Sequence, residues 1–178
     1  LLDGGDLWIA TFGGGLHIMN LSTGERTIYT HDPLDSTSIS SDRTRVLLKD
    51  KRGNIWLGTN LGLNRFSPAS SHGFDRFLPN RRVYSLYESG KGIIWVGSYN
   101  DGLFALDQSG NILSHYQEKN GLPGHSIFGI LEDKLGRIWV STDNGIAKLN
   151  PKDDQITAFN YSDGLTNLEF NFNAYAKT

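Results

Sequence analysis

The side chains that most often catalyse reactions or bind metals are few in this chain and widely spaced. The 178 residues include no cysteine, which excludes disulfides, a cysteine-ligated zinc and a thiol nucleophile. No serine-hydrolase elbow, zinc-protease helix or phosphate-binding loop is present, and the glycine run at 13–15 is expected to form a hairpin corner. We therefore predict no catalytic residues, no metal site and no cofactor. The histidines that this prediction sets aside are His17, His31, His72, His115 and His125.

Two aspartates could act as acids or bases, but their sequence context favours a structural role. Asp50 begins the stretch DKRGN and Asp133 begins DKLGR. An aspartate at the head of a tight turn accepts hydrogen bonds from nearby backbone N–H groups, and a glycine three residues later can adopt a positive φ. We predict that both carboxylates cap turns.

These turns belong to a repeat that contains all four tryptophans of the chain. Trp8, Trp56, Trp95 and Trp139 are 48, 39 and 44 residues apart, and each lies in a short apolar strand pattern that a turn with glycine follows. Repeats of roughly 40 residues that contain several strands are typical of β-propeller blades. A tryptophan can also stack on a sugar, but four of them at one strand position indicate core residues.

The pattern within each repeat predicts an all-β fold in which blades pack on blades. Apolar residues alternate with tryptophan in the second strand, so both faces are expected to be buried. Small residues follow two positions after each tryptophan and leave room for a neighbouring sheet: Ala10, Gly58, Gly97 and Ser141. We predict a β-propeller of about four blades of four antiparallel strands, a fragment of a larger, seven-bladed propeller. The expected repeats are roughly 1–45, 46–82, 83–125 and 126–168, and 169–178 starts a further blade.

Charge and hydropathy exclude several classes of partner. The net charge is −2 and acids are interspersed with bases, so no basic stripe is available for nucleic acid. No apolar run approaches the roughly 18 residues that a membrane-spanning helix needs.

The loops offer better candidates for binding. In a propeller, the loops between strands two and three and the linkers between blades lie on one face, and loops on a rigid scaffold often bind ligands. The first group offers Phe12, Asn60, Tyr99, Asn100, Asp101, Asp143 and Asn144, and the second Arg43, Arg45, Arg81, Arg82, His125, Asn167 and Glu169. Guanidinium, amide and carboxylate groups beside an exposed tyrosine suit hydroxyl-rich ligands. The residues that we predict to bind a ligand are Arg45, Asn60, Arg82, Tyr99, Asn100, Asp101, His125, Asp143, Asn144 and Asn167.

The repeats also resemble a known family. The segments SISSDRTRVLLKDKRGNIWLGTNLGLNRFSP and LPGHSIFGILEDKLGRIWVSTDNGIAKLNP are similar to the regulator-propeller repeats in periplasmic sensor regions of Bacteroides-type hybrid two-component systems. DGLTNLEFNFNAYAK resembles the stretch that leads into the last blade of the second propeller in that family. The repeat at 83–125 departs from the pattern, because Ser89 replaces the aspartate of the turn.

The resemblance implies an extracytoplasmic sensor segment of an inner-membrane protein. It also implies an oligosaccharide ligand released from a complex glycan, a homodimeric parent sensor, and a histidine kinase elsewhere in that parent. Two alternatives stay open: a dimerisation scaffold without a small-molecule site, and a propeller lyase or glycan hydrolase. Turnover, or loop substitutions that change association without changing glycan binding, would distinguish them.

Overall fold

The computed structural model describes residues 1–67 and 73–171, and its strands form four antiparallel sheets. Each sheet has four strands in chain order, as a meander, and the tryptophan lies in the second strand. The all-β, four-stranded blade predicted from the repeats is confirmed. The residues expected to start a further blade lie largely outside the described residues.

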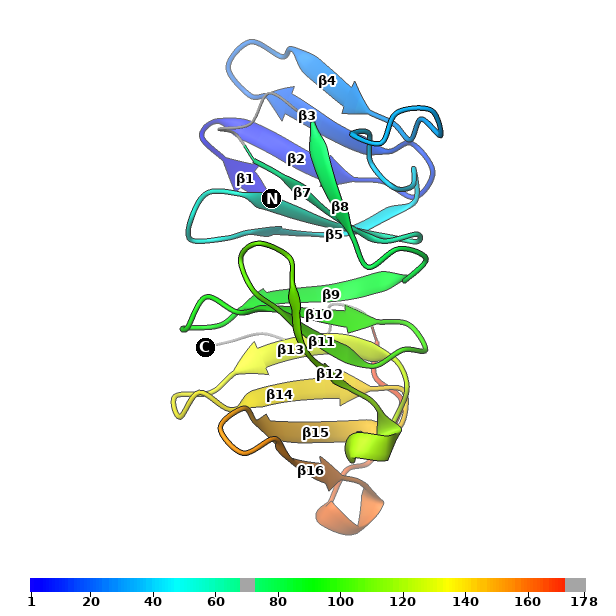
Figure 1. Ribbon diagram of the computed structural model, residues 1–178, viewed down its shortest axis with the longest axis vertical. Helices are drawn as coiled ribbons and strands as arrows, with labels where there is room; N and C mark the ends of the chain where they lie inside the picture. The colour runs from blue at the N-terminus through cyan, green and yellow to red at the C-terminus, as the bar shows by residue number, and fades with distance from the viewer. Residues whose placement is uncertain (68–72, 172–178) are drawn as a thin grey trace. The chain divides into compact units, whose positions relative to one another are not determined.

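The chain divides into two compact units, Leu1–Val83 and Tyr84–Thr178. Unit 1 contains two sheets, which Figure 1 draws from blue to green. Their strands are β1 (Leu2–Asp3), β2 (Asp6–Ala10), β3 (Leu16–Asn20) and β4 (Arg26–Tyr29), followed by β5 (Thr44–Lys49), β6 (Ile55–Thr59), β7 (Leu63–Phe66) and β8 (Phe74–Phe77).

Unit 2 contains the other two sheets and two short 3-10 helices. Its strands are β9 (Val83–Glu88), β10 (Ile94–Ser98), β11 (Leu103–Leu106) and β12 (Ile112–Tyr116), followed by β13 (Ile127–Glu132), β14 (Ile138–Thr142), β15 (Gly145–Asn150) and β16 (Gln155–Phe159). The helices are η1 (Glu118–Asn120) and η2 (Tyr161–Asp163). No helix among the described residues is long and apolar enough to cross a membrane.

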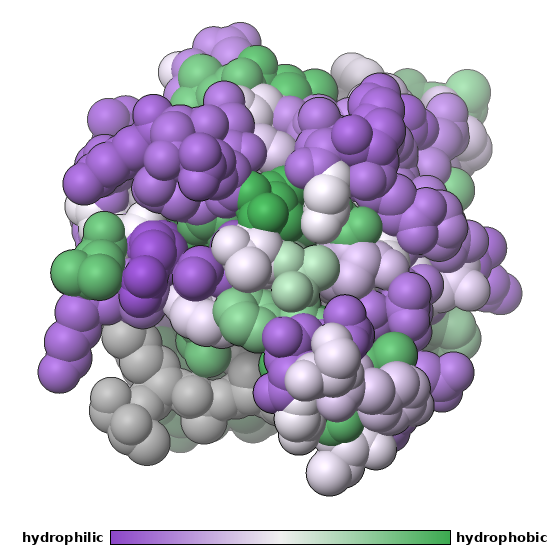
Figure 2. Space-filling view, turned by 90° about the horizontal axis from the view of Figure 1, so that it is seen from below, coloured by the Kyte–Doolittle hydropathy of each residue, from purple (hydrophilic) through white to green (hydrophobic). Residues whose placement is uncertain are grey.

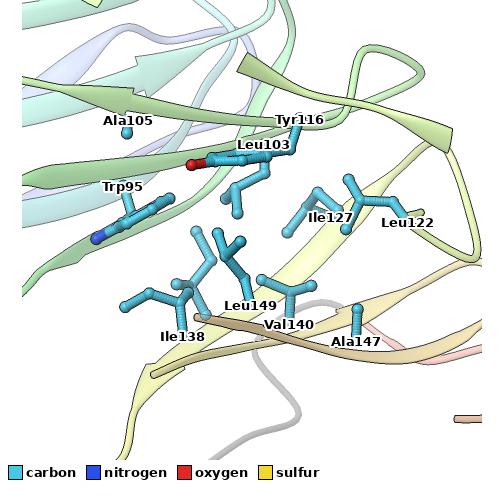
Figure 3. Close-up of a cluster of buried hydrophobic side chains, with 11 residues drawn as sticks. Trp95, Leu103, Ala105, Tyr116, Leu122, Ile127, Ile138, Val140, Ala147 and Leu149 are labelled. Atoms are coloured by element: carbon cyan, nitrogen blue, oxygen red, sulfur yellow. The ribbon is translucent and has the colours of Figure 1, made fainter. Parts of the chain in front are cut away.

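The core of each unit lies between its two sheets. In unit 1, Trp8 and Leu16 of the first sheet pack with Ile55 and Leu57 of the second. In unit 2, Trp95 of β10 packs with Ile127, Ile138 and Val140 of the next sheet, and Figure 3 shows these side chains between the two ribbons. Each fully buried side chain of this kind contributes about 1.5–3 kcal/mol to the free energy of unfolding. The two sheets of a unit therefore stabilise one another.

Small residues after the tryptophans allow this close approach. A Cβ added to Gly97 would lie 2.1 Å from the Ser85 hydroxyl oxygen and 2.8 Å from Cβ of Ile127. Ser85 and Ile127 therefore fill the space that a side chain at position 97 would need.

Among the second strands of the sheets, β6 and β10 are buried at every residue. In β14 the alternate residues are half-buried, because Trp139 lies on the face opposite the core and stacks on Phe159 at 5.4 Å between ring centroids. Seen from the end where β16 and η2 lie, the surface has a central apolar area surrounded by hydrophilic atoms (Figure 2). The prediction that both faces of the second strand are buried thus holds for β6 and β10, but not for β2 or β14.

Tyr116 illustrates how a polar group enters the core of unit 2. Its ring stacks on Trp95 at 6.2 Å, and its hydroxyl donates to the carboxylate of Asp154. Burial, with this bond to a carboxylate, raises the pKa of Tyr116 to about 12. The neutral phenol is therefore the form that the fold stabilises.

The predicted aspartate turns accept hydrogen bonds from the tryptophans as well as from the backbone. Asp50 Oδ1 accepts from the N–H groups of Arg52 and Asn54, both at 2.9 Å, and Oδ2 accepts from Nε1 of Trp56 at 2.8 Å. Asp133 does the same for Trp139 at 2.9 Å.

The environment of Asp133 favours its charged form. Partial burial alone would raise the pKa of this carboxyl, but hydrogen bonds from Trp139 and Arg137 outweigh burial and hold its pKa well below the usual value. The aspartate thus joins the turn to the second strand of the blade.

Candidate functional site

In each sheet, a turn joins the end of the second strand to the start of the third strand. In all four turns a threonine or serine donates its side-chain hydroxyl to the carbonyl of a glycine at the end of the turn. The pairs, with oxygen–oxygen distances, are Thr11–Gly15 (2.7 Å), Thr59–Gly62 (3.0 Å), Ser98–Gly102 (2.9 Å) and Thr142–Gly145 (2.9 Å). These bonds hold the turns in one shape, so their remaining side chains project from a fixed backbone.

The linkers between sheets run beside these turns. The N–H of Gly15 donates to the carbonyl of Asp42 at 3.0 Å, and the N–H of Gly102 donates to that of His125 at 2.8 Å. Gly145 donates in the same way to Leu168 at 2.7 Å. The two groups of loops considered as binding elements therefore lie side by side within each unit.

In unit 1 these loops form a cluster of Phe12, Arg43, Arg45 and Asn60, here called the Arg–Phe cluster. Phe12 is 69% exposed, although it lies in a turn whose backbone is bonded to the linker. The guanidinium carbons of Arg43 and Arg45 lie 5.3 and 5.2 Å from the centre of its ring. Nε of Arg45 donates to Oδ1 of Asn60 at 2.5 Å.

The cluster combines an aromatic face with fixed hydrogen-bond donors. Cations within about 6 Å of a ring centre are attracted to its face, so both arginines are held near the ring. The bond to Asn60 further orients Arg45. Such a surface can take up a flat ligand that carries hydroxyl or carboxylate groups.

In unit 2, Tyr99 of the equivalent loops belongs to an aromatic row with Tyr84 of β9 and Phe128 of β13. The Tyr84 ring lies 5.3 Å from that of Tyr99 and 6.2 Å from that of Phe128. Tyr99 is 38% exposed, whereas the other two rings are buried. Beside it, Asn100 adopts φ 62° and its N–H donates to the Ser126 hydroxyl at 3.2 Å.

Several residues predicted to bind a ligand also make hydrogen bonds within or between the loops. Oδ1 of Asp101 accepts from Gln117 Nε2 at 2.9 Å, and Oδ1 of Asp143 accepts from the Ser126 N–H at 3.2 Å. Nδ2 of Asn144 donates to the carbonyl of Pro123, and Oδ1 of Asn167 accepts from the N–H of Glu169. These four side chains already have intramolecular partners, which reduces what they can offer to a ligand.

The other predicted residues are closer to solvent. Arg82 is exposed, and so is His125, whose ring lies 3.2 Å from the Glu118 carboxylate. The described histidines are separately engaged: His17 with the Gly14 carbonyl, His31 with that of Ile39 and His115 with that of Asp101. Among residues 1–67 and 73–171, no group of three side chains suited to a metal comes together. His72 lies outside these residues.

Comparison with known proteins gives the repeats a family. Residues 38–61, 78–100 and 121–144 match the family described as "Two component regulator propeller". These three segments are two-component regulator propeller repeats. The three matches end in or next to the turns that follow β6, β10 and β14, whereas the turn that carries Phe12 lies outside the matched residues.

A curated relative and two solved structures are similar to these repeats. "Histidine kinase P4" of Formosa agariphila is 34% identical over 94% of the chain, which spans only 13% of that relative's length. The extracellular domain of BT4673 from B. thetaiotaomicron, described as a hybrid two component system, is 25% identical with a TM-score of 0.76. That match covers 92% of this chain and 24% of the other.

The extracellular domain of BT3049, from the same organism and described in the same way, shares the fold. It is 23% identical with a TM-score of 0.73, over 86% of this chain and 22% of the other. These likenesses confirm the propeller-type fold.

Phe12 and Arg43 are absent from the residues predicted to bind a ligand, although both lie in the loops singled out. Phe12 directly precedes a glycine run, and the turn does not require an aromatic residue there. This unusual position could have identified Phe12 from the sequence. Arg43 could not be chosen over Arg81 or Arg82, because its contact with Phe12 depends on the bridge between two distant loops.

Proposed function

We propose that these repeats are part of the extracytoplasmic ligand-sensing region of a hybrid two-component sensor, and that the Arg–Phe cluster binds a glycan-derived oligosaccharide. The observation that carries the proposal is an exposed phenylalanine with two arginines near its ring, on a backbone fixed by hydrogen bonds. The relative named a histidine kinase and the extracellular neighbours support the sensor context and a place outside the cytoplasm.

The chemistry of the cluster suits a sugar. An exposed aromatic side chain offers an apolar face for the C–H side of a sugar ring, and burial of aromatic area dominates the energetics of many interfaces. Guanidinium groups bind paired oxygens in the plane, as on a carboxylate or neighbouring hydroxyls. The ring would set the position of a sugar and the arginines its orientation.

Ligand binding would change the activity of the sensor only if the ligand binds one conformation of the sensor more tightly than another. A ligand shifts a conformational equilibrium by no more than its differential affinity for the two conformations. We propose that the repeats supply a rigid surface and that the arrangement of a parent homodimer changes when an oligosaccharide binds.

The test is a thermal-shift screen of this chain against a panel of glycan-derived oligosaccharides. A ligand present at 100 times its Kd adds about 2.7 kcal/mol to the free energy of unfolding, which gives a shift of several degrees in Tm. We expect a shift with at least one oligosaccharide, and we expect Phe12→Ala and Arg45→Ala each to abolish it.

Matched control variants distinguish a loss of ligand binding from a general effect of the substitution on the fold. Tyr161→Ala removes a ring that is 62% exposed elsewhere in the chain, and Arg26→Ala removes an exposed arginine of β4. Both should keep the ligand-induced shift. If the control variants lose the shift as readily as the cluster variants, or if no oligosaccharide shifts the Tm, the Arg–Phe cluster is not a glycan site. Release of shorter sugars from the panel would instead favour an enzyme.

A further inference from the structure

The turn between β9 and β10 lacks the carboxylate that the equivalent turns contain. Ser89 stands where Asp50 and Asp133 stand, yet the backbone of the turn is unchanged. The Ser89 N–H donates to the Ile93 carbonyl at 2.9 Å and the Gly92 N–H to the Ser89 carbonyl at 3.0 Å, as in the Asp50 turn. The turn therefore keeps the regular geometry although Ser89 replaces the aspartate.

The substitution leaves one donor without an acceptor. The Ser89 hydroxyl accepts from the Ile93 N–H at 3.1 Å and so replaces one oxygen of the aspartate. The second oxygen, which accepts from the indole in the sister turns, has no counterpart. Nε1 of Trp95 is buried and has no hydrogen-bond partner within the described part of the chain. A buried donor without a partner is rare in proteins and calls for an explanation.

A pocket opens at this position in unit 2, and Trp95 lines it. Ile93 and Ile138 contribute apolar walls, and Lys91 and Lys152 contribute positive charge. Figure 3 shows the indole nitrogen of Trp95 at the end of the ring that lies away from the other labelled core residues. Both lysines are exposed.

We propose that this pocket binds the carboxylate group of a small organic acid. Nε1 of Trp95 has almost no solvent-accessible area in this structure, so an acid reaches it only when side chains that line the pocket shift, as interface side chains commonly do on binding. One carboxylate oxygen then accepts from Nε1, as the Asp50 oxygen accepts from Trp56 at 2.8 Å. The apolar part of the acid packs on Ile93 and Ile138. The pocket lies at the turns between first and second strands, the opposite edge of the sheets from the loops considered for oligosaccharide binding, so the two proposals are independent.

Charge in the pocket favours an anion over a neutral acceptor. The residues that line the pocket include two lysines, Lys91 and Lys152, and one carboxylate, that of Glu132. Oε2 of Glu132 accepts from the N–H of Gly90 at 2.7 Å, so part of its charge is already compensated. The remaining positive charge attracts an acid to the otherwise unpaired indole.

The test is a titration of the ¹⁵N-labelled chain with sodium propionate, followed through the four indole N–H signals in the NMR spectrum. We expect a saturable shift of the Trp95 signal toward higher proton frequency, while the signals of Trp8, Trp56 and Trp139 stay in place. Propionamide and sodium chloride at equal concentration should leave Trp95 unchanged. Each methylene added from formate to propionate should tighten binding by up to about fourfold.

Two substitutions make the outcome decisive. Ser89→Asp supplies the carboxylate from the chain, so the Trp95 signal should already be shifted and should no longer respond to propionate. Lys91→Gln and Lys152→Gln, which change only exposed side chains, should each weaken binding about two- to fivefold. Trp95→Phe assigns the signal; where that variant does not fold, the response of Ser89→Asp assigns it instead. An unresponsive Trp95, or an equal response to chloride, would overturn the proposal and leave solvent as the occupant of the pocket.

Discussion

Removal of the Asp50 carboxylate should lower the free energy of unfolding by more than the loss of the turn's backbone hydrogen bonds alone. In Asp50→Ala, the N–H groups of Arg52 and Asn54 lose their acceptor but are near solvent. Nε1 of Trp56 also loses its acceptor, and this side chain is fully buried. An unsatisfied buried donor costs about 1–3 kcal/mol, and a hydrogen bond to a charged group contributes about 1.5–3 kcal/mol. We expect a total loss of about 3 kcal/mol.

Asp107→Ala is the matched control. Asp107 begins DQSGN, which resembles the DKRGN of Asp50, and its carboxylate accepts from the N–H groups of Ser109 and Asn111 and from the Asn111 side chain. No tryptophan N–H is among the bonds of this carboxylate. The control therefore loses the turn bonds but leaves no buried indole unpaired, and we expect about 1 kcal/mol.

The assay is urea unfolding followed by circular dichroism, with the slope of the transition compared between variants. With a slope of about 1–3 kcal/mol per molar urea, a loss of 3 kcal/mol moves the midpoint by about 1 M or more. Asp50→Ser should lie between wild type and Asp50→Ala, since a serine at this position keeps one acceptor, as Ser89 does. If Asp50→Ala costs no more than Asp107→Ala, the indole bond does not stabilise the blade and the reasoning fails.

Three further predictions concern packing and pH. Gly97→Ala should cost about 1–3 kcal/mol in urea unfolding, because the new methyl group overlaps Ile127. Tyr116 should ionise near pH 12 in an absorbance titration at 295 nm; its contribution to stability is complete below the pKa of a free tyrosine, about 10, and is lost as the pH rises to 12. Tyr116→Phe should lose this alkaline dependence, and ionisation near pH 10 in the folded chain would contradict the burial argument. The lowered pKa of Asp133 contributes stability above about pH 4 that is lost as the pH falls further. Asp133→Asn should therefore differ from wild type more at pH 6 than at pH 3, and a constant difference in urea midpoint would refute it.

The candidate site was only partly predictable, because side chains that look alike in a loop differ in their partners. Asp101 and Asn100 are neighbours in one turn, yet the side chain of the first accepts from Gln117 and that of the second from Ser126. Gln117 is sixteen residues away from Asp101, and no local pattern indicates that the two meet. Whether a polar loop residue is available to a ligand depends on such distant contacts.

The sequence by itself determined the blade. Four tryptophans at one strand position, small residues two positions later and aspartate–glycine turns specify a four-stranded meander through local periodicity and turn geometry, which depend on residues close together in the chain. Tertiary structure alone decided which groups are exposed, paired or unpaired. Phe12 lies beside two arginines because a turn pairs with a linker some thirty residues away, and Asp101 accepts from a glutamine sixteen residues away. Long-range packing sets these properties, and local sequence preferences do not encode it.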